Sequence, residues 1–294
     1  MARRSAAEQT AFGPMVIAAV EQLEPADRRI VTDPLALQFL PPAMAFLVRA
    51  CRWRWWHGQL VRATENKALG IWGGMLCRKR YADDQVRRAL GDETGIDQLV
   101  VLGAGYDTRA YRLTDPQRVR AYEVDLPANI DTKRARVRAA LGETPGHVRL
   151  VPVDFETNGL AESLAAKGFR LDRPAMFVWE AVTQYLTEDA VRHTLALLAK
   201  AAPGSRLAFT YIRQDFLDGT NTYGAEGAYR DFVERHRIWH FGLHPDQVGT
   251  LLDDYGWTER EQVGAAEYRQ RYLEPARRDM PVSEIERFVT ADKS

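Results

Sequence analysis

The chain has 294 residues, and its 40 basic and 40 acidic side chains give a formal net charge of +0 at pH 7. This balance gives no electrostatic argument for nucleic-acid binding, and the length permits one elaborated domain or two. The two cysteines, Cys51 and Cys77, are too few for a secreted disulfide framework and lack the Cys-x-x-Cys spacing of a metal site.

The N-terminal ten residues, M-A-R-R-S-A-A-E-Q-T, lack the apolar core of a signal peptide. The apolar run Ala43–Val48 is far shorter than the roughly 20 residues that cross a bilayer. We therefore expect a cytoplasmic protein without a membrane span.

The region before Ile96 shows apolar residues at the three- and four-residue spacing of helices. It is punctuated by several prolines and by Gly73-Gly74. The predicted helices are Pro14–Leu23, Pro34–Leu40, Ala43–Leu60 and Ala82–Leu90. They indicate an N-terminal helical cap subdomain, residues 1–95, over a core formed by residues 96–294.

The segment Arg52–His57, R-W-R-W-W-H, has an unusual composition with three possible interpretations. The tryptophans can pack within a cap helix while the arginines remain solvated. They can line a pocket for a flat, hydrophobic acceptor. Interleaved arginine and tryptophan are also found where proteins meet membrane surfaces or stacked bases.

Leu99–Leu113, L-V-V-L-G-A-G-Y-D-T-R-A-Y-R-L, predicts an apolar strand followed by a glycine-rich turn. Gly103 and Gly105 allow unusual backbone angles and let a ligand approach the main chain. A dinucleotide fingerprint would place a small third residue where Thr108 stands, and Tyr106 would crowd a pyrophosphate. The turn therefore favours S-adenosylmethionine over NAD.

Three further predicted strands end in polar groups. Val119–Leu126 carries Glu123 and Asp125 on one face, and either acid can bind ribose hydroxyls. His147–Val153 leads to Asp154-Phe155, a polar group and an apolar ring suited to adenine. Pro174–Trp179 leads to Glu180, with Tyr185 shortly beyond. Ligands of open α/β sheets bind at such carboxyl ends.

The rest of the chain predicts helix Glu188–Ala201, strand Ser205–Ile212, an inserted lid over about residues 213–243, helix His244–Tyr255 and closing strands. His236, His240 and His244 lie at four-residue steps, which a metal ion could use. Gly242 interrupts this run, however, and no cysteine stands nearby. We expect no metal, and His240 remains either a surface residue or one that faces the acceptor.

Four motifs in this order resemble the leucine carboxyl methyltransferase superfamily: V-L-G-A-G-Y-D-T-R, E-V-D-L-P, V-D-F and W-E-A-V-T-Q-Y-L-T. The resemblance covers roughly Asp33 onward and is strongest to the bacterial branch, which includes O-methyltransferases of polyketide and other secondary metabolism. It implies an α/β, Rossmann-like class I methyltransferase sheet, mostly parallel with one antiparallel strand. Flanking helices, an N-terminal helical cap and an inserted lid complete this fold.

The resemblance also implies site residues. Its cofactor contacts correspond to the glycine turn, to Asp125 for the ribose, to Asp154 and Phe155 for adenine, and to Glu180 near the methionine end. An upstream arginine that meets the cofactor carboxylate corresponds to Arg78 in C-R-K-R-Y-A-D-D, with Arg80 as the alternative. Cys77 and Lys79 depart from the family pattern there. The full set of candidate cofactor contacts is Arg78, Gly103, Ala104, Gly105, Asp107, Glu123, Asp125, Asp154, Phe155 and Glu180.

We predict S-adenosylmethionine-dependent O-methylation of a small aromatic or hydrophobic acceptor, such as a polyketide. Methyl transfer needs alignment and exclusion of water more than dedicated catalytic groups. Arg78 or Tyr185 would orient a carboxylate acceptor, whereas a phenol would use His240 as general base. The alternatives are an NAD-dependent oxidoreductase, for which no Tyr-x-x-x-Lys is evident, and a protein that binds the cofactor without methylating. The oligomeric state stays open.

Overall fold

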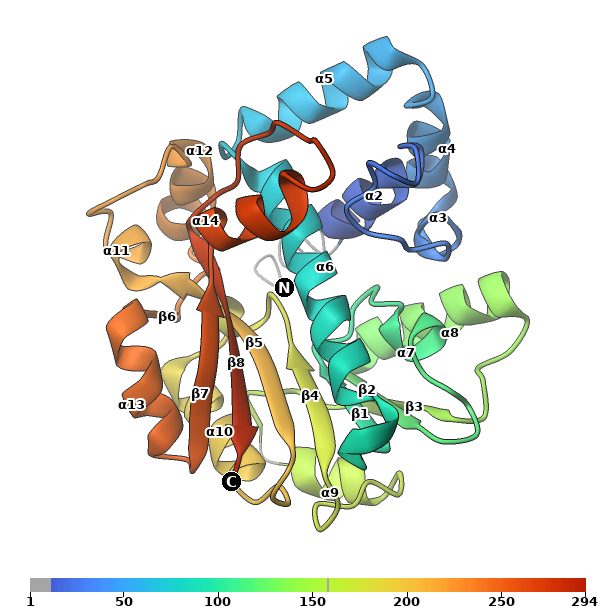
Figure 1. Ribbon diagram of the computed structural model, residues 1–294, viewed down its shortest axis with the longest axis vertical. Helices are drawn as coiled ribbons and strands as arrows, with labels where there is room; N and C mark the ends of the chain where they lie inside the picture. The colour runs from blue at the N-terminus through green and yellow to red at the C-terminus, as the bar shows by residue number, and fades with distance from the viewer. Residues whose placement is uncertain (1–11, 158) are drawn as a thin grey trace.

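The computed structural model describes residues 12–157 and 159–294, in which one twisted sheet is flanked by helices (Figure 1). The described strands are β1 (Gln98–Leu102), β2 (Arg120–Asp125), β3 (Val148–Pro152), β4 (Ala175–Trp179), β5 (Arg206–Arg213), β6 (Gly242–Leu243), β7 (Trp257–Val263) and β8 (Glu286–Lys293). Their order is β3-β2-β1-β4-β5-β8-β7, and β6 pairs with β5.

Neighbouring strands from β3 to β5 are parallel, whereas β8 runs antiparallel to both β5 and β7. This arrangement confirms the predicted class I methyltransferase sheet with one antiparallel strand.

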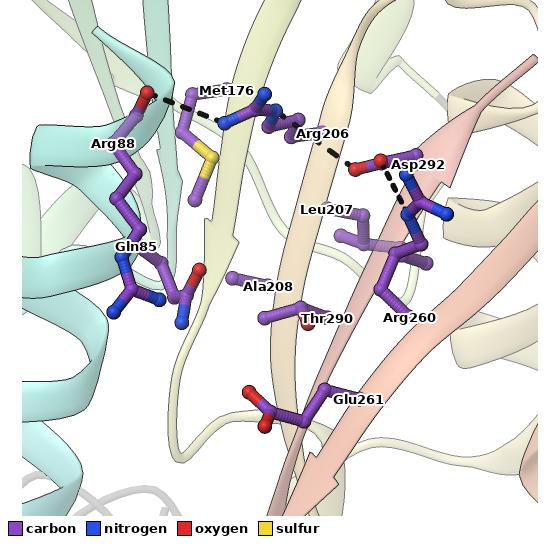
Figure 2. A pocket seen from close by; sticks show the side chains of 11 residues that line it. Gln85, Arg88, Met176, Arg206, Leu207, Ala208, Arg260, Glu261, Thr290 and Asp292 are labelled. Atoms are coloured by element: carbon purple, nitrogen blue, oxygen red, sulfur yellow. Dashed lines mark hydrogen bonds and ion pairs between the residues drawn. The ribbon is translucent and has the colours of Figure 1, made fainter. Parts of the chain in front are cut away.

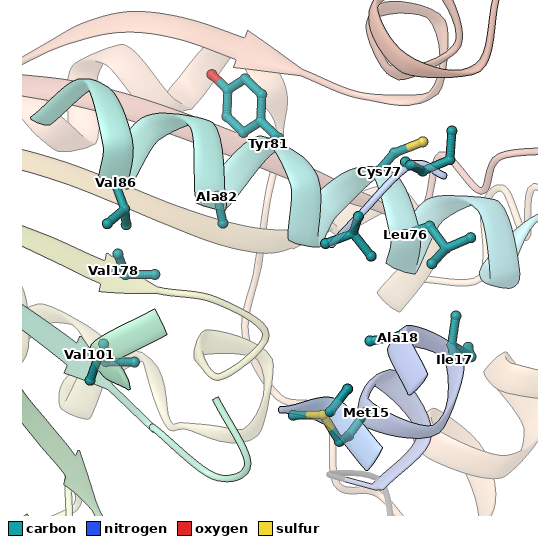
Figure 3. Packing of buried hydrophobic residues seen from close by; sticks show 14 of the residues in the cluster. Met15, Ile17, Ala18, Leu76, Cys77, Tyr81, Ala82, Val86, Val101 and Val178 are labelled. Carbon is teal, nitrogen blue, oxygen red and sulfur yellow. The ribbon is translucent and has the colours of Figure 1, made fainter. Parts of the chain in front are cut away.

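The central strands are apolar on both faces because helices cover both sides of the sheet. In β1, Leu99 and Val101 face a core that includes α6 (Ile71–Ala89). Val100 and Leu102 face the opposite core, which includes α10 (Glu188–Leu198). Figure 3 shows the first of these cores, where Ala82 and Val86 of α6 lie over Val178 and Val101. Leu76, earlier in α6, lies toward Ala18 and Ile17 of the N-terminal helix.

The helices before β1 are α2 (Phe12–Glu21), α3 (Ala36–Phe39), α4 (Pro42–Ala50), α5 (Arg54–Glu65) and α6. The predicted single helix Ala43–Leu60 was wrong, because the chain breaks between α4 and α5 where Trp53 adopts an extended conformation. Gly73-Gly74 was interpreted as a break between predicted helices but lies inside α6. The N-terminal ten residues of the signal-peptide argument lie outside the described residues.

Gly73 has a packing role that explains its place in a helix. A Cβ added there would lie 2.3 Å from the carbonyl oxygen of Pro281. Glycine therefore allows the segment before β8 to approach the backbone of α6.

The later helices are α7 (Arg109–Arg112), α8 (Pro127–Leu141), α9 (Leu160–Ala165), α11 (Gln214–Leu217), α12 (Glu226–Ala228), α13 (Val248–Asp253) and α14 (Ala265–Tyr268). The expected helix His244–Tyr255 is shorter, since a 3-10 turn over Pro245–Gln247 precedes α13. Between β5 and β6, short helical segments include a wide π-helical turn over Tyr229–Arg235. In the described part of the chain, no helix is long and apolar enough to span a membrane.

Candidate functional site

The candidate site lies at the carboxyl ends of β1, β2 and β4. Strand β1 pairs with β2 on one side and with β4 on the other. The strand order reverses between β1 and β4, which creates the crevice where ligands of open α/β sheets bind. The sheet thus brings the glycine turn, Asp125 and Glu180 to one edge.

The glycine turn is shaped by backbone angles that favour glycine. Gly103 has φ +72° and Gly105 has φ +41°. A Cβ on Gly103 would also lie 2.2 Å from the Cγ2 of Val182. The turn is held by the backbone amides of Gly103 and Ala104, which donate to the carbonyl oxygen of Val124 at 2.8 and 2.9 Å.

The two acidic residues of β2, Glu123 and Asp125, lie in different environments. The Oδ2 of Asp125 accepts from the Gly105 amide at 2.6 Å, which places this carboxylate directly beside the turn. Glu123 is fully buried; its Oε1 forms an ion pair with Lys133 Nζ at 2.6 Å, and its Oε2 accepts from the Tyr111 hydroxyl at 2.5 Å. Burial, opposed by Lys133, raises the pKa of Glu123 to about 7. Asp125 is therefore the better candidate for ribose, and Glu123 already has two internal partners.

Asp154 and Phe155 follow β3 beside this edge. The backbone amide of Val153 donates to the Asp125 carbonyl oxygen at 2.8 Å, which ties the β3 end to the β2 end. Asp154 is half-buried, whereas Phe155 is buried in the core that includes Val151 and Leu160. Both remain predicted adenine contacts.

A buried network of ion pairs surrounds Glu180. Its Oε1 lies 2.7 Å from Arg78 Nε, and its Oε2 lies 2.7 Å from Arg109 Nη2. Through Arg78, Arg109 and Arg112 the network holds five carboxylates, those of Asp33, Asp83, Asp107, Glu180 and Glu286.

The carboxylates nearest the turn stay ionised. Burial opposes the charged form of Glu180, but Arg109 and Arg78 outweigh it and lower its pKa to about 2. Loss of solvation likewise opposes the charged form of the half-buried Asp107, but Arg109, Lys79 and Lys133 outweigh it and lower its pKa below the ordinary value. The site therefore offers fixed negative charge next to the glycine turn.

The two candidate arginines have different surroundings. Arg78 donates from Nε to Glu180 and from Nη1 to Glu286, so much of its donor capacity is already used inside the protein. Arg80 pairs instead with Asp84 at 3.0 Å and donates to the Ile30 carbonyl oxygen at 3.2 Å. Of the two, Arg78 is the one that the structure brings to the site.

Sequence reasoning missed several members of this network. Arg109 directly follows the glycine turn, and Asp83 lies one helical turn beyond Lys79 on α6. The sequence positions of both residues could therefore have indicated that they belong to the site. Glu286 lies 208 residues from Arg78, and no local pattern connects the two.

The segment after Glu180 meets the region expected to form a lid. Ala181 has φ +58°, an uncommon angle for alanine, and its amide donates to Thr210 Oγ1 at 2.7 Å. The 3-10 turn Thr183–Tyr185 follows, and the Gln184 carbonyl oxygen accepts from the His240 amide at 2.7 Å. Tyr185 is half-buried and the His240 side chain is exposed, so both candidates lie near this edge.

The three histidines do not share a helical face. The wide turn ends at Arg235, and the residues from there to β6 contain no further helix. Within residues 12–157 and 159–294, no three metal-ligating side chains form a cluster.

A cavity of about 320 Å³ lies elsewhere, at the amino ends of the parallel strands (Figure 2). Met176 and Arg206 line it near the starts of β4 and β5, together with Asp292 near the end of β8. Its position at the opposite end of the sheet separates it from the candidate site.

A family model described as leucine carboxyl methyltransferase matches residues 11–199. The chain belongs to this family. Among its relatives, a protein of Streptomyces avermitilis named putative S-adenosyl-L-methionine-dependent methyltransferase is 30% identical over 209 residues, covering 69% of this chain and 70% of the relative. A Frankia alni protein of the same description is 29% identical over 280 residues, covering 90% and 88%.

Solved structures support the fold of this leucine carboxyl methyltransferase family member. A methyltransferase structure from Thermobifida fusca, also titled putative, superposes with a TM-score of 0.58 at 16% identity, covering 94% of this chain and 97% of that one. The expected family and sheet are therefore confirmed.

Proposed function

We propose that this S-adenosylmethionine-dependent methyltransferase methylates an oxygen atom of a small hydrophobic or aromatic acceptor. Membership of the leucine carboxyl methyltransferase family supports methyl transfer and S-adenosylmethionine as the cofactor. The choice of an oxygen acceptor, and of a carboxylate or phenol from polyketide or other secondary metabolism, is our inference from the resemblance and from the polar groups near Glu180.

The buried charges of the site carry the proposal. The ion pairs of Arg78, Arg109 and Arg112 hold five carboxylates, and Arg87 also pairs with Asp83 at 4.0 Å. Two of these carboxylates, Asp107 and Glu180, have lowered pKa values beside the glycine turn. S-adenosylmethionine has two positive groups, the sulfonium and the ammonium, which such ionised carboxylates suit. At Gly105 the one atom within 4 Å of an added Cβ would be the Gly103 carbonyl oxygen at 4.0 Å, so the space beside this part of the turn is open to the same ligand.

Each candidate residue has a role in this proposal. Asp125, ordered by the Gly105 amide, accepts from ribose hydroxyls. Asp154 and Phe155 bind adenine, and Glu180 faces the ammonium group of the amino-acid tail. The bound sulfonium supplies an electrophilic methyl group, which the acceptor oxygen takes while the bonding electrons stay on sulfur.

The acceptor side is formed by Tyr185 and by the segment containing His240. A carboxylate acceptor is already ionised and needs only orientation by Tyr185. A phenol also has a proton to lose, and His240 is the candidate base for it. Water exclusion would come from the segment between β5 and β6, which already contacts Gln184 through the His240 amide.

The first experiment is calorimetric titration with S-adenosylhomocysteine, after mass spectrometry has excluded copurified cofactor. We expect micromolar binding, followed by S-adenosylhomocysteine formation from S-adenosylmethionine when aromatic acids and phenols are screened. Failure of the folded, cofactor-free protein to bind would overturn the proposal. Binding without turnover on any acceptor would favour the alternative of a cofactor-binding protein that does not methylate.

A further inference from the structure

The junction between α4 and α5 exposes a cluster of large apolar side chains. In the described residues, four of the seven exposed large apolar side chains lie between residues 46 and 56: Phe46, Trp53, Trp55 and Trp56. Phe46 is 73% exposed and Trp53 68%. The expectation that the tryptophans pack within a cap helix was therefore wrong. An exposed apolar cluster of this kind indicates an interaction site.

Helix α5 is fixed on the molecule, so this exposure belongs to the folded chain. The inner side of α5 packs through Leu60 and Val61, which are half-buried against the core that includes α6. The end of α5 is tied to the start of α6, because the Glu65 carboxylate accepts from the backbone amides of Gly70 at 2.7 Å and Trp72 at 3.0 Å. Figure 1 shows α5 along the outer edge of the molecule.

The same stretch is cationic although the whole chain is neutral. Residues 42–62 contain four arginines and no acidic residue. Arg49, Arg52 and Arg62 are exposed, and within the described part of the chain their guanidinium groups form no ion pair and no hydrogen bond. Their charges are therefore available to an anionic partner. We call the exposed side chains of residues 46–62 the α5 surface.

We infer that the α5 surface docks on an anionic lipid membrane. Tryptophan favours the membrane–water interface, because its ring is apolar and its indole N–H can stay among the polar headgroups. Arginine adds attraction to anionic headgroups, whose phosphate the guanidinium group binds well. Both features lie at the outer edge of the molecule, where a planar bilayer can reach them (Figure 1). The inference goes beyond methyl transfer, since docking involves neither the glycine turn nor Glu180.

A second copy of the chain is a less suitable partner for this surface. In a symmetric dimer, each α5 surface would lie against the α5 surface of the other copy. The unpaired arginines of the two copies would then approach each other, and like charges across an interface oppose association.

Nucleic acid and a small acceptor also fit the surface less well. Single-stranded nucleic acids stack their bases on open aromatic faces. Trp55 and Trp56 instead contact each other edge to face, with ring centroids 4.7 Å apart, so one ring covers a face of the other. A pocket for a small acceptor would enclose its aromatic rings, whereas Trp53 is 68% exposed and Trp55 63%.

Vesicle flotation with the full chain tests the docking. We expect the protein to float with vesicles of phosphatidylglycerol and phosphatidylcholine at low salt, and not with vesicles of phosphatidylcholine alone. Added salt should weaken the binding, because it screens the attraction between arginines and headgroups. Absence of binding to the anionic vesicles at low salt would overturn the inference.

The aromatic contribution is tested by Trp55→Ala/Trp56→Ala. This variant should bind anionic vesicles about tenfold or more weakly than the unmodified protein. Leu23→Ala/Leu141→Ala removes exposed apolar side chains elsewhere and should have no effect. If the first variant does not fold, Trp53→Ala replaces it, since Trp53 lies between α4 and α5. Unchanged binding of a folded aromatic variant would contradict the inference.

The charged contribution is tested by Arg52→Gln/Arg62→Gln. At low salt this variant should also bind anionic vesicles about tenfold or more weakly. Arg138→Gln/Lys200→Gln is the matched control, because it removes two exposed positive charges elsewhere and changes the net charge equally. Equal losses in both variants would show attraction by overall charge instead of the α5 surface, and would overturn the inference.

Fluorescence shows whether the tryptophans themselves reach the lipid. Anionic vesicles with brominated acyl chains should quench the fluorescence of the unmodified protein, and should quench that of Trp55→Ala/Trp56→Ala much less. Equal quenching of both would place the contact outside the α5 surface. Light scattering completes the test: a stable oligomer that the same variant dissociates would show that a second copy covers the surface, and would overturn the inference.

Discussion

Gly103 combines two constraints at one residue of the candidate site. Its φ of +72° is costly for a side chain, and a Cβ would meet Val182 at 2.2 Å. Val182 follows the strained Ala181, so the turn after β1 and the turn after β4 depend on each other's shape. A substitution at Gly103 or at Val182 should therefore change the shape of both turns.

Gly103→Ala should therefore lower the free energy of unfolding by about 1–3 kcal/mol and weaken S-adenosylhomocysteine binding. Gly142→Ala is the matched control, because Gly142 has φ +85° with nothing within 4 Å of its added Cβ. Gly142→Ala should lower the free energy of unfolding only by the cost of its backbone angle, and it should leave the affinity for S-adenosylhomocysteine unchanged. Urea denaturation and calorimetry measure the two effects, and equal losses in both variants would contradict the steric argument.

The two acids of β2 should respond differently to substitution. Asp125→Ala removes the carboxylate beside the glycine turn and should weaken S-adenosylhomocysteine binding by about 1–3 kcal/mol. Glu123→Gln leaves Lys133 without its buried counter-charge, so it should lower stability more than affinity. Calorimetry and thermal unfolding on both variants check this, and unchanged affinity in Asp125→Ala would transfer the ribose role to Glu123.

Helix α6 connects the helices before it to the candidate site. This 19-residue helix supplies Arg78 and Asp83 to the ion-pair network, while Gly73 near its start allows the segment before β8 to pack closely. The same helix covers one face of β1 and β4. Its position therefore determines both the packing of the sheet and the charges at the site.

The adjacent glycines of α6 offer a direct comparison. Gly73→Ala should lower the free energy of unfolding by about 1–3 kcal/mol, because its Cβ would meet the Pro281 carbonyl oxygen. Gly74→Ala should be neutral or stabilising by up to about 1 kcal/mol, since its Cβ would find Ser283 N at an ordinary 3.6 Å and alanine favours helices. Chemical denaturation of the pair measures this, and similar effects of both substitutions would contradict the close-packing argument.

Local sequence patterns predicted the strands that build the site, and the reason is physical. Short apolar runs such as Leu99–Leu102 are buried on both faces, so they carry a strong signal and end where polar ligand groups begin. No local pattern predicted the break before α5. A helix break was predicted at Gly73 because Pro281, which packs against it, is distant in sequence. Neither Glu286 nor the internal pairing of Glu123 could be read from local spacing.

At the scale of the whole molecule, the buried ion-pair network connects regions far apart in the chain. It runs from Asp33 through α6 and α7 to Glu180 and on to Glu286 in β8. Such pairs lose solvation on burial, and breaking one partner leaves the other uncompensated. The network is thus sensitive to removal of any single charge and to protonation of its acids.

Acid should weaken the folded state through this network. The folded-state pKa of Glu180, about 2, lies below its ordinary value of 4.5. Its contribution is therefore present above about pH 4.5 and is lost as the pH falls toward 2, on the order of 3 kcal/mol. In urea denaturation at pH 6, 5, 4 and 3, the stability difference between the unmodified protein and Glu180→Gln should shrink. A difference that stays constant over this range would show that Glu180 is not preferentially ionised.

The contact between Arg78 and Glu286 also has a consequence for the folding of the chain. These residues are 208 positions apart, and Glu286 belongs to β8, which must insert between β5 and β7. Contacts this distant form slowly because a long loop has to close first. A chain without an inserted β8 can have its glycine turn and most of its sheet, yet Arg78 has no second counter-charge and α6 has no close-packed neighbour at Gly73. We therefore expect affinity for the cofactor to be acquired late in folding, so that a ligand stabilises the completed protein but does not rescue partly folded chains.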